Sequence, residues 1–414
     1  MYKFKDLVTP IVSLVILTLG SALLTTFLTL RLHNLGVNSF IIGGLSTAYY
    51  GGMVIGAFKL EVIILRVGHI RTYSACASIL AVASLLHGFY VNGYFWLVLR
   101  FIEGIATAGL YIVIESWILS TSDDKSRGSA LALYMIALYL AQSIGQWLLN
   151  LGHQDTLIIY AVSSMFAALS VIPLALTSTE MPSFMEPDTL SIKRMFKLSP
   201  AGVTTCFASG LILGSLYGLF PAYIQHLGFS MSGISTIMGL TILGGMLFQY
   251  PFGRLSDWMS RRYVIAMLAL ITASISATLL YLPLLSLWQM GTISFFLGGA
   301  IFCLYPIGIS HACDVIDSNQ IISATQTLLF AYGIGATLGP LIAPIGNLYA
   351  PGSGILIFII LISTPLCVYM LWRKRAGKSI ASEDKQDFTL SVEMTPVAIE
   401  LDPRAETNDT IEEQ

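Results

Sequence analysis

Residues 253–262 read Gly-Arg-Leu-Ser-Asp-Trp-Met-Ser-Arg-Arg, a short polar stretch that holds three arginines and one aspartate. It stands between two long apolar segments, near residues 231–252 and 263–284. Each segment is long enough to cross the hydrocarbon core of a bilayer, which takes about 20 apolar residues. A basic stretch between two such segments predicts two transmembrane helices joined at one face of a membrane.

The same alternation runs through the first 375 residues. Only 11% of the whole chain is charged and 55% is hydrophobic, whereas soluble proteins carry roughly a quarter charged residues. The composition therefore excludes a soluble globular protein and predicts an all-α membrane protein with twelve transmembrane helices. The expected helices lie near residues 8–32, 39–60, 72–92, 95–119, 128–150, 156–177, 201–225, 231–252, 263–284, 287–312, 321–345 and 352–372.

Positive charge distinguishes the two sides of the membrane. If the N-terminus is inside, the inside connections hold fifteen Lys and Arg residues, and the outside connections hold little beyond Arg31. Because Lys and Arg are enriched in cytoplasmic loops, both chain ends are predicted to be cytoplasmic. The inside residues are Lys3, Lys5, Arg66, Arg71, Lys125, Arg127, Lys193, Arg194, Lys197, Arg254, Arg261, Arg262, Arg373, Lys374 and Arg375.

The chain divides into four regions. We expect an N-terminal six-helix bundle at 1–177, a cytoplasmic linker at 178–200, a C-terminal six-helix bundle at 201–375 and a tail at 376–414. The tail holds three basic against ten acidic residues, a composition that predicts a disordered cytoplasmic segment. The five cysteines form no Cys-x-x-Cys pair, so no disulfide framework, metal site or other cofactor is expected.

The two halves repeat each other when one is shifted by 194 residues. Because each half has six spans, both copies enter the membrane from the same side. Parallel repeats of this kind meet at an interface that carries the substrate path. The matches are Gly20-Ser21 on Gly214-Ser215, Gly104 on Gly298, Tyr111 on Tyr305, Ser116 on Ser310, Ser129-Ala130 on Ser323-Ala324 and Gly145 on Gly339.

Residues 253–262 resemble the loop signature of the major facilitator superfamily, which is a Gly, an Asp four residues later and then paired basic residues. The first half holds a weaker copy at Arg66-Val-Gly-His-Ile-Arg71, in which Leu65 stands in the Asp position. Further stretches resemble a YcaD-like bacterial branch of this superfamily, over residues 1–375. They are Glu115-Ser116-Trp117, Gln249-Tyr250-Pro251 running into Gly253, and Tyr305-Pro306 with His311 and Asp314.

The resemblance implies two pseudo-symmetric six-helix bundles and secondary active transport across the bacterial inner membrane. It implies a monomer in lipid that moves a small-molecule substrate by alternating access, commonly with a proton as the coupling ion. We favour efflux slightly over uptake, because a cavity with few fixed charges suits amphipathic compounds. Uptake stays open, since Arg100 can bind the carboxylate of an imported metabolite.

Charged residues within predicted spans are the first candidates for the pathway, because burying one costs about 2.5–3.5 kcal/mol on insertion scales. Arg100 and Glu103 share one face of the fourth segment, where they can pair. Arg100-x-x-x-Gly104 resembles the superfamily's fourth-helix motif, in which the Arg is often linked to proton coupling. The alternative is that Arg100 extends to the outer membrane surface. Gln142 and Gln146 are expected to line the cavity, although amides also join helices.

A second group of candidates lies toward the cytoplasmic side. Glu115, His311 and Asp314 are expected to form a polar cluster between the bundles. A His beside a carboxylate can act as a proton-linked switch, and a purely structural gate is the alternative. The residues expected to act as a conformational latch are Gly68, Arg71, Gly253, Asp257, Arg261 and Arg262.

Other functional classes lack their motifs. The sequence has no phosphate-binding loop, no His-Glu-x-x-His and no nucleophile elbow, so neither an ATP-driven pump nor an enzyme is expected. The basic loops are short and suit membrane topology better than nucleic acid. The acidic tail keeps one competing class open, which is a non-transporting membrane sensor or receptor built on the same scaffold.

The latch hypothesis predicts the behaviour of Asp257→Asn. This change removes the carboxylate charge and keeps the side-chain size, so the protein should remain folded in the membrane while transport slows severely. Arg254→Gln removes a charge from the same stretch and serves as the control. Normal turnover of Asp257→Asn in a flux assay would contradict the latch role.

Overall fold

The computed structural model describes residues 3–122, 126–152, 157–177, 191–282, 285–316, 320–376, 386, 388–391 and 395–404. Within these ranges, twelve helical segments are long and apolar enough to span a membrane. The predicted all-α architecture with twelve transmembrane helices is confirmed.

The helices of the first half follow the predicted segments closely. Most of them begin or end within a few residues of the expected positions, and α1 and α2 extend further toward the side that carries the N-terminus. These elements are α1 (Lys3–Asn34), α2 (Ser39–Val67), α3 (His69–Phe89), α4 (Gly93–Thr121), α5 (Arg127–Trp147), η1 (Leu148–Leu151), α6 (Ile158–Leu169) and α7 (Val171–Ala175).

The second half adds a short helix, α8, ahead of its six spans. Its elements are α8 (Ile192–Leu198), α9 (Pro200–His226), α10 (Met231–Trp258), α11 (Arg261–Tyr281), α12 (Leu287–Phe302), α13 (Leu304–Cys313), α14 (Ile321–Ile342), η3 (Ala343–Leu348) and α15 (Gly354–Ala376). Helix α8 falls within the expected linker, of which residues 178–190 lie outside the described part of the chain.

The stretch 253–262 differs from the expected loop. Helix α10 continues to Trp258, so Gly253 and Asp257 lie in its last two turns, and α11 begins at Arg261. Only two residues separate the helices. In the weaker copy, Gly68 makes the turn alone between α2 and α3, with a φ of 93° that favours glycine.

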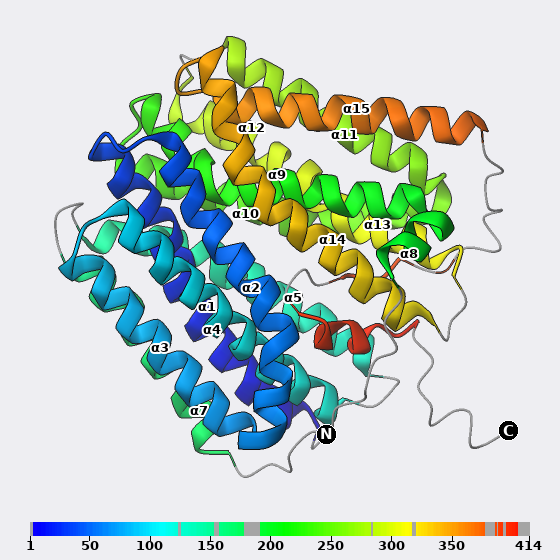
Figure 1. Ribbon diagram of the computed structural model, residues 1–414. Helices are drawn as coiled ribbons and strands as arrows, with labels where there is room; N and C mark the ends of the chain where they lie inside the picture. The colour runs from blue at the N-terminus through cyan, green and yellow to red at the C-terminus, as the bar shows by residue number, and fades with distance from the viewer. Residues whose placement is uncertain are drawn as a thin grey trace, which may run out of the picture.

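The two halves pack as similar bundles that lie side by side (Figure 1). In the first, α2 packs on α4 and α3 packs on α6; in the second, the corresponding pairs are α10 with α12 and α11 with α15. The bundles meet through α1, α2 and α5 on one side and α9, α10 and α14 on the other. The structure therefore repeats its internal packing as the sequence repeats its residues.

Glycines allow the closest of these helix contacts. A Cβ on Gly104 would overlap the carbonyl oxygen of Tyr49 across the α2–α4 contact, and a Cβ on Gly298 would overlap that of Thr241 across the α10–α12 contact. Gly104 and Gly298 are one of the repeat matches. Small residues at such positions let helix backbones approach closely in membranes.

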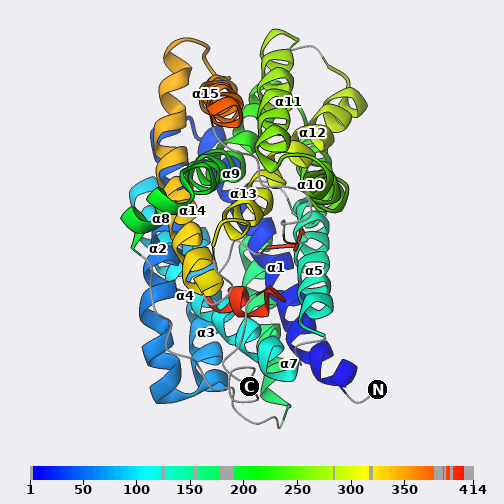
Figure 2. The same ribbon diagram turned by 90° about the vertical axis from the view of Figure 1, so that its right-hand side faces the viewer.

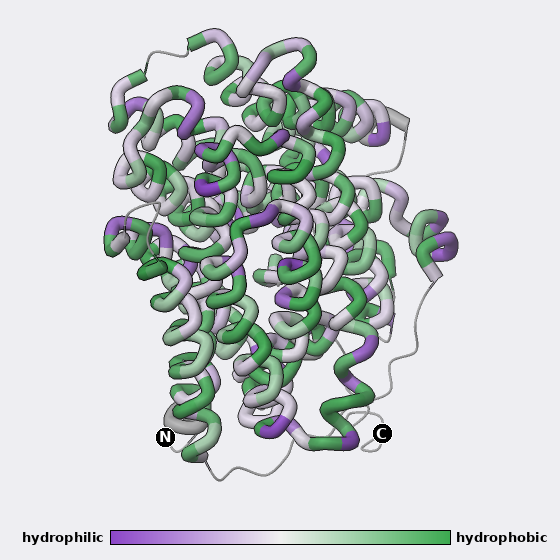
Figure 3. The backbone as a smooth tube through the Cα atoms, turned by 60° about the vertical axis from the view of Figure 1, so that its left-hand side comes forward, coloured by the Kyte–Doolittle hydropathy of each residue, from purple (hydrophilic) through white to green (hydrophobic). Residues whose placement is uncertain are grey.

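The lateral surface suits lipid. Hydrophobic positions dominate the lengths of the helices (Figure 3), and many large apolar side chains are exposed, including Val62, Leu270 and Leu361. Exposed apolar area on this scale would be unfavourable in water. All five cysteines are buried.

The two ends of the molecule differ in charge. We call the end that carries Arg66, Arg71, Arg261, Arg262 and Arg373 the basic end, and the end that carries Asn34, Gln225 and Ser235 the opposite end. The N-terminus lies at the basic end with the start of α1 (Figure 1).

The structure describes part of the tail, namely residues 386, 388–391 and 395–404. Residues 397–401 form η5 (Val397–Leu401), and Thr395 and Leu401 are fully buried at the basic end. Three apolar residues in η5, at 397, 399 and 401, are buried there, a feature that the acidic composition of the whole tail concealed.

Substitution of Gly298 tests the close helix contact. Gly298→Ala would place its Cβ against the backbone of α10, and overpacking of this kind costs typically about 1–3 kcal/mol. We expect a lower melting temperature of the purified protein in detergent. Gly233→Ala on α10 is the control, because its Cβ would lie 3.5 Å from its nearest neighbours, an ordinary contact. Equal melting temperatures for the two variants would contradict the packing argument.

Candidate functional site

A cavity lies at the centre of the molecule, between the two bundles. Together with its opening to solvent it encloses about 900 Å³ that protein atoms do not fill. Helices of both bundles contribute, with most side chains coming from the first. The lining residues are Thr18, Ser21, Ala22, Thr25, Thr26, Ser46, Tyr49, Tyr50, Met53, Arg100, Tyr111, Met135, Leu138, Tyr139, Gln142, Gln146, Tyr217, Ile242 and Tyr332.

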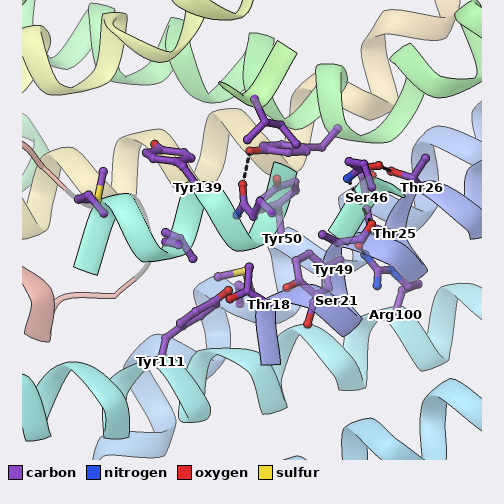
Figure 4. Close-up of a pocket in the computed structure, with 18 of the residues that line it drawn as sticks. Thr18, Ser21, Thr25, Thr26, Ser46, Tyr49, Tyr50, Arg100, Tyr111 and Tyr139 are labelled. Atoms are coloured by element: carbon purple, nitrogen blue, oxygen red, sulfur yellow. Dashed lines mark hydrogen bonds between the residues drawn. The ribbon is translucent and has the colours of Figure 1, made fainter. Parts of the chain in front are cut away.

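The cavity wall is aromatic and polar but carries little charge. Six of the lining residues are tyrosines, five carry aliphatic hydroxyls and two are glutamines. Arg100 is the single charged side chain among the described residues that line it. In Figure 4, Arg100 and Thr25 lie at one end of the cavity, and Tyr111 and Tyr139 lie at the other.

Arg100 is held at the cavity wall by three contacts. Its Nη1 donates to Oε2 of Glu103 over 3.0 Å, its Nη2 donates to Oγ1 of Thr25 over 3.2 Å, and its guanidinium lies 4.1 Å from the ring centre of Tyr49. The side chain is buried, so the alternative that Arg100 extends to the membrane surface is wrong. The expected pairing with Glu103 is present.

Glu103 lies behind Arg100 and is fully buried. Its Oε1 is 3.5 Å from Nδ1 of His87, and that nitrogen also lies 2.7 Å from the carbonyl oxygen of Ala83. A buried carboxylate is stable only when it is paired and hydrogen-bonded. Arg100, Glu103 and His87 therefore form one buried cluster with its cation on the cavity side.

The two glutamines contact their surroundings in different ways. Gln142 accepts a hydrogen bond from Tyr217 of the second bundle over 2.9 Å, so this pair joins the bundles across the cavity. Gln146 accepts from Thr26 over 2.8 Å and is buried within the first bundle. Both line the cavity.

The expected cluster of Glu115, His311 and Asp314 is divided between the two bundles. Glu115 accepts a hydrogen bond from Tyr134 over 2.7 Å and another from Thr395 of the tail. Asp314 pairs with Arg261, with 2.7 Å between Oδ2 and Nε.

His311 and Asp314 have separate basic partners. Nε2 of His311 lies 3.5 Å from Nε of Arg262, whereas Asp314 pairs with Arg261. The geometry thus places His311 beside a cation, where the sequence predicted a neighbouring carboxylate.

The latch residues of the second half are grouped at the basic end. Arg261 is buried, and it pairs with Asp314 and, at 3.4 Å, with Asp257. Arg262 donates to the carbonyl oxygen of Arg373 over 3.0 Å. Gly253 packs against Phe388 of the tail. In the first half Arg71 is exposed, next to the turn at Gly68.

At the opposite end, side chains of the two bundles bond directly. Thr29 donates to the carbonyl of Gly218 over 3.0 Å, and Ser143 donates to that of Gly239 over 2.9 Å. Asn150 also bonds Ser235 over 3.3 Å. Gln225 donates to Asn34 over 2.7 Å. These bonds draw the bundles together on that side of the cavity.

The sequence-based prediction missed several residues of the cavity and of the buried cluster behind Arg100. His87 reads as a lone interior histidine, and Tyr217 and Tyr332 read as ordinary core aromatics. His87 lies on α3 and Glu103 lies on α4, so no helical periodicity links the two residues. For Tyr217, a signal was present, because it follows the repeated Gly214-Ser215 pair directly on the seventh span.

Comparison with known proteins agrees with the fold. The family model described as Major Facilitator Superfamily matches residues 11–340 and 203–401. The chain is 31% identical over 368 residues to "Uncharacterized MFS-type transporter YcaD" of Escherichia coli O45:K1 (strain S88 / ExPEC), covering 88% of this chain and 94% of that protein.

Solved transporters share the fold at low sequence identity. A point mutant of the nucleoside transporter NupG superposes with a TM-score of 0.76 and 15% identity, over 89% of this chain and 99% of NupG. A bacterial homologue of the human lysosomal transporter Spinster, inward-facing and occupied, gives a TM-score of 0.72 and 14% identity, over 93% and 98%.

These relatives are named as transporters, and none of them supports the sensor alternative. The fold and the relatives agree with the absence of an enzyme motif. On the family model, the identity to YcaD and the architecture, the chain belongs to the major facilitator superfamily and is a multi-pass membrane transporter.

Proposed function

We propose that this transporter moves a small amphipathic solute across the bacterial inner membrane by alternating access, coupled to protons. The observation that carries the proposal is the cavity between the bundles, which is lined from both of them and holds one buried, ion-paired arginine. A site at the interface of parallel repeats can face either side as the bundles rock.

The charge distribution supports an orientation. Lys and Arg concentrate at the basic end, which by the positive-inside rule faces the cytoplasm. With that orientation both chain ends are cytoplasmic, and the hydrogen bonds at Asn34, Gln225 and Ser235 close the periplasmic side. The conformation described above is then an inward-facing one.

The cavity wall favours a ring-containing, weakly charged solute. Tyrosine rings stack on planar groups, and the hydroxyls and amides supply hydrogen bonds that fix orientation. Arg100 is neutralised by Glu103 and covered by Tyr49, so it does not offer a free cation to an anionic metabolite. For this reason we favour export over uptake.

The buried cluster suggests how a proton is coupled to opening. With Glu103 ionised and His87 neutral, the cluster of Arg100, Glu103 and His87 has no net charge. A proton on Glu103 or His87 leaves one uncompensated positive charge in the protein interior, which costs several kcal/mol. Admitting water or rearranging Arg100 relieves that cost, so protonation favours a change of conformation. A proton moving inward can thereby drive the solute outward.

A thermal-shift screen of the purified protein tests the solute class. The probes are amphipathic antimicrobials, amino acids, siderophores and carboxylated metabolites. A ligand that binds only the folded state adds about 2.7 kcal/mol of stability at a hundredfold excess over its Kd. We expect ring-containing amphipathic compounds to raise the melting temperature. A response confined to carboxylated metabolites would contradict both the solute class and the preference for export.

Glu103→Gln tests proton coupling. The glutamine keeps the size of the side chain and can still accept a hydrogen bond from Arg100, but it cannot take up a proton. In proteoliposomes loaded with a compound found in the screen, accumulation driven by a pH gradient should fall at least about tenfold, equivalent to about 1.4 kcal/mol. Exchange of the compound down its own gradient should persist.

The control for Glu103→Gln is Glu61→Gln. Glu61 lies on α2 near the basic end and does not line the cavity, so its removal should leave both measurements unchanged. Unaltered pH-driven accumulation in Glu103→Gln would exclude Glu103 as the proton carrier.

A further inference from the structure

Residues 386–404 occupy the space between the bundles at the basic end, in those positions that the structure describes. Figure 2 shows η5 between α14 of the second bundle and α4 and α5 of the first, and η5 packs on all three helices. Thr395 and Leu401 are fully buried, and Asp402 is 4% exposed. These residues of the acidic tail are therefore as buried as the residues of the hydrophobic core.

The segment contacts the first bundle at two points. The hydroxyl of Thr395 donates to the carboxylate of Glu115 on α4. A Cβ built on Gly128, at the start of α5, would lie 3.6 Å from Cγ of Pro403. Helix η5 packs on α4 and α5 between these points.

The same segment contacts the second bundle with charged and polar groups. Arg404 donates to the hydroxyl of Ser310 on α13 over 3.1 Å, and its own charge is paired with Asp402, with 2.8 Å between Nε and Oδ1. The backbone N–H of Gln386 donates to Asp314 over 3.3 Å, and the carbonyl of Gln386 accepts from Arg261.

These contacts fall on the residues that the sequence marks as the latch and gate. Glu115 and Ser310 belong to the stretches aligned by the repeat, and Gly253, Arg261 and Asp314 belong to or pair with the signature loop. The bundles can close at the basic end only if this space is vacated. A segment that binds one conformation and not the other shifts the equilibrium toward the first by its differential affinity.

We propose that the tail forms an internal plug through residues 386, 388–391 and 395–404, which binds between the bundles in the inward-facing state, opposes closure of the basic end and so restrains the transport cycle. The proposal rests on the alternating-access function proposed above. It adds a binding site on the transporter, made by Glu115, Gly128, Ser310 and Asp314, whose ligand is the chain's own tail.

A designed disulfide tests docking of the tail. With Gly128→Cys and Pro403→Cys the two Cβ atoms would lie 4.0 Å apart, within the range of about 3.5–4.5 Å that a disulfide needs. Mild oxidation of the purified full chain should link the two cysteines, as detected by mass spectrometry of the digested protein. The control pair is Gly36→Cys with Pro403→Cys, because Gly36 follows α1 at the opposite end. Absence of the 128–403 link would overturn docking.

Distances between spin labels test the restraint on closure. Labels at Ser120 and Val315, exposed at the ends of α4 and α13, report the width of the basic end. Ending the chain after Ser379 removes the plug, whereas ending it after Arg404 keeps every contact described and is the control. The shorter chain should gain a population with a shorter distance, and the control should match the full chain.

A point substitution covers the case in which truncation harms folding. Leu401→Asp places a carboxylate where the leucine is fully buried, which should expel η5 and produce the same shorter distance. Identical distance distributions in full chain, truncation and Leu401→Asp would overturn the plug. Because these measurements need no solute, they separate a failure of the plug from a failure of the transport function, which would appear as absent flux in every form.

Discussion

A bilayer gives two helical bundles no hydrophobic reason to stay together, because lipid tails are as apolar as the helix surfaces. In this protein hydrogen bonds join the two bundles, and such bonds can break and form again with other partners. At the opposite end hydroxyls of Thr29 and Ser143 reach backbone carbonyls, and in the cavity Tyr217 bonds Gln142. Glycines bring helix backbones into direct contact within each bundle, as at Gly104 and Gly298, and also between the bundles, where Gly43 of α2 meets the carbonyl of Pro340 on α14.

The division into two bundles explains where charge is found. Arg100 and Glu103 neutralise each other inside the first bundle, and Arg261 and Asp314 do so in the second. Each pair belongs to one half and can travel with it as a rigid unit. Contacts across the interface are made mostly by neutral groups, whose exchange for water or a solute costs little. The tail is the exception, since it brings Asp402 and Arg404 together into the space between the halves.

Much of the fold could be predicted from the sequence, because length and hydropathy determine what can cross a membrane. The twelve spans follow from the length and hydropathy of single segments, the repeat from residue matches between the halves, and the Arg100–Glu103 pair from spacing along one helix. The helical continuation of α10 through Asp257 and the partners of His311 do not, since they depend on how the helix ends pack. His87 and Glu103 lie on different helices, and the burial of Leu401 depends on a cavity made by distant segments. Local sequence patterns do not predict contacts between segments that are distant in the chain.

The buried position of Leu401 and Thr395 also bears on how fast the tail binds and dissociates. A segment attached to α15 competes for the space between the bundles at a local concentration set by its tether, on the order of millimolar for short connections. Such a segment needs only weak affinity to stay in place, and weakly held groups dissociate quickly. Occupancy would then be independent of how many copies the cell makes. Occupancy of the space between the bundles would fall quickly when a partner binds the free tail.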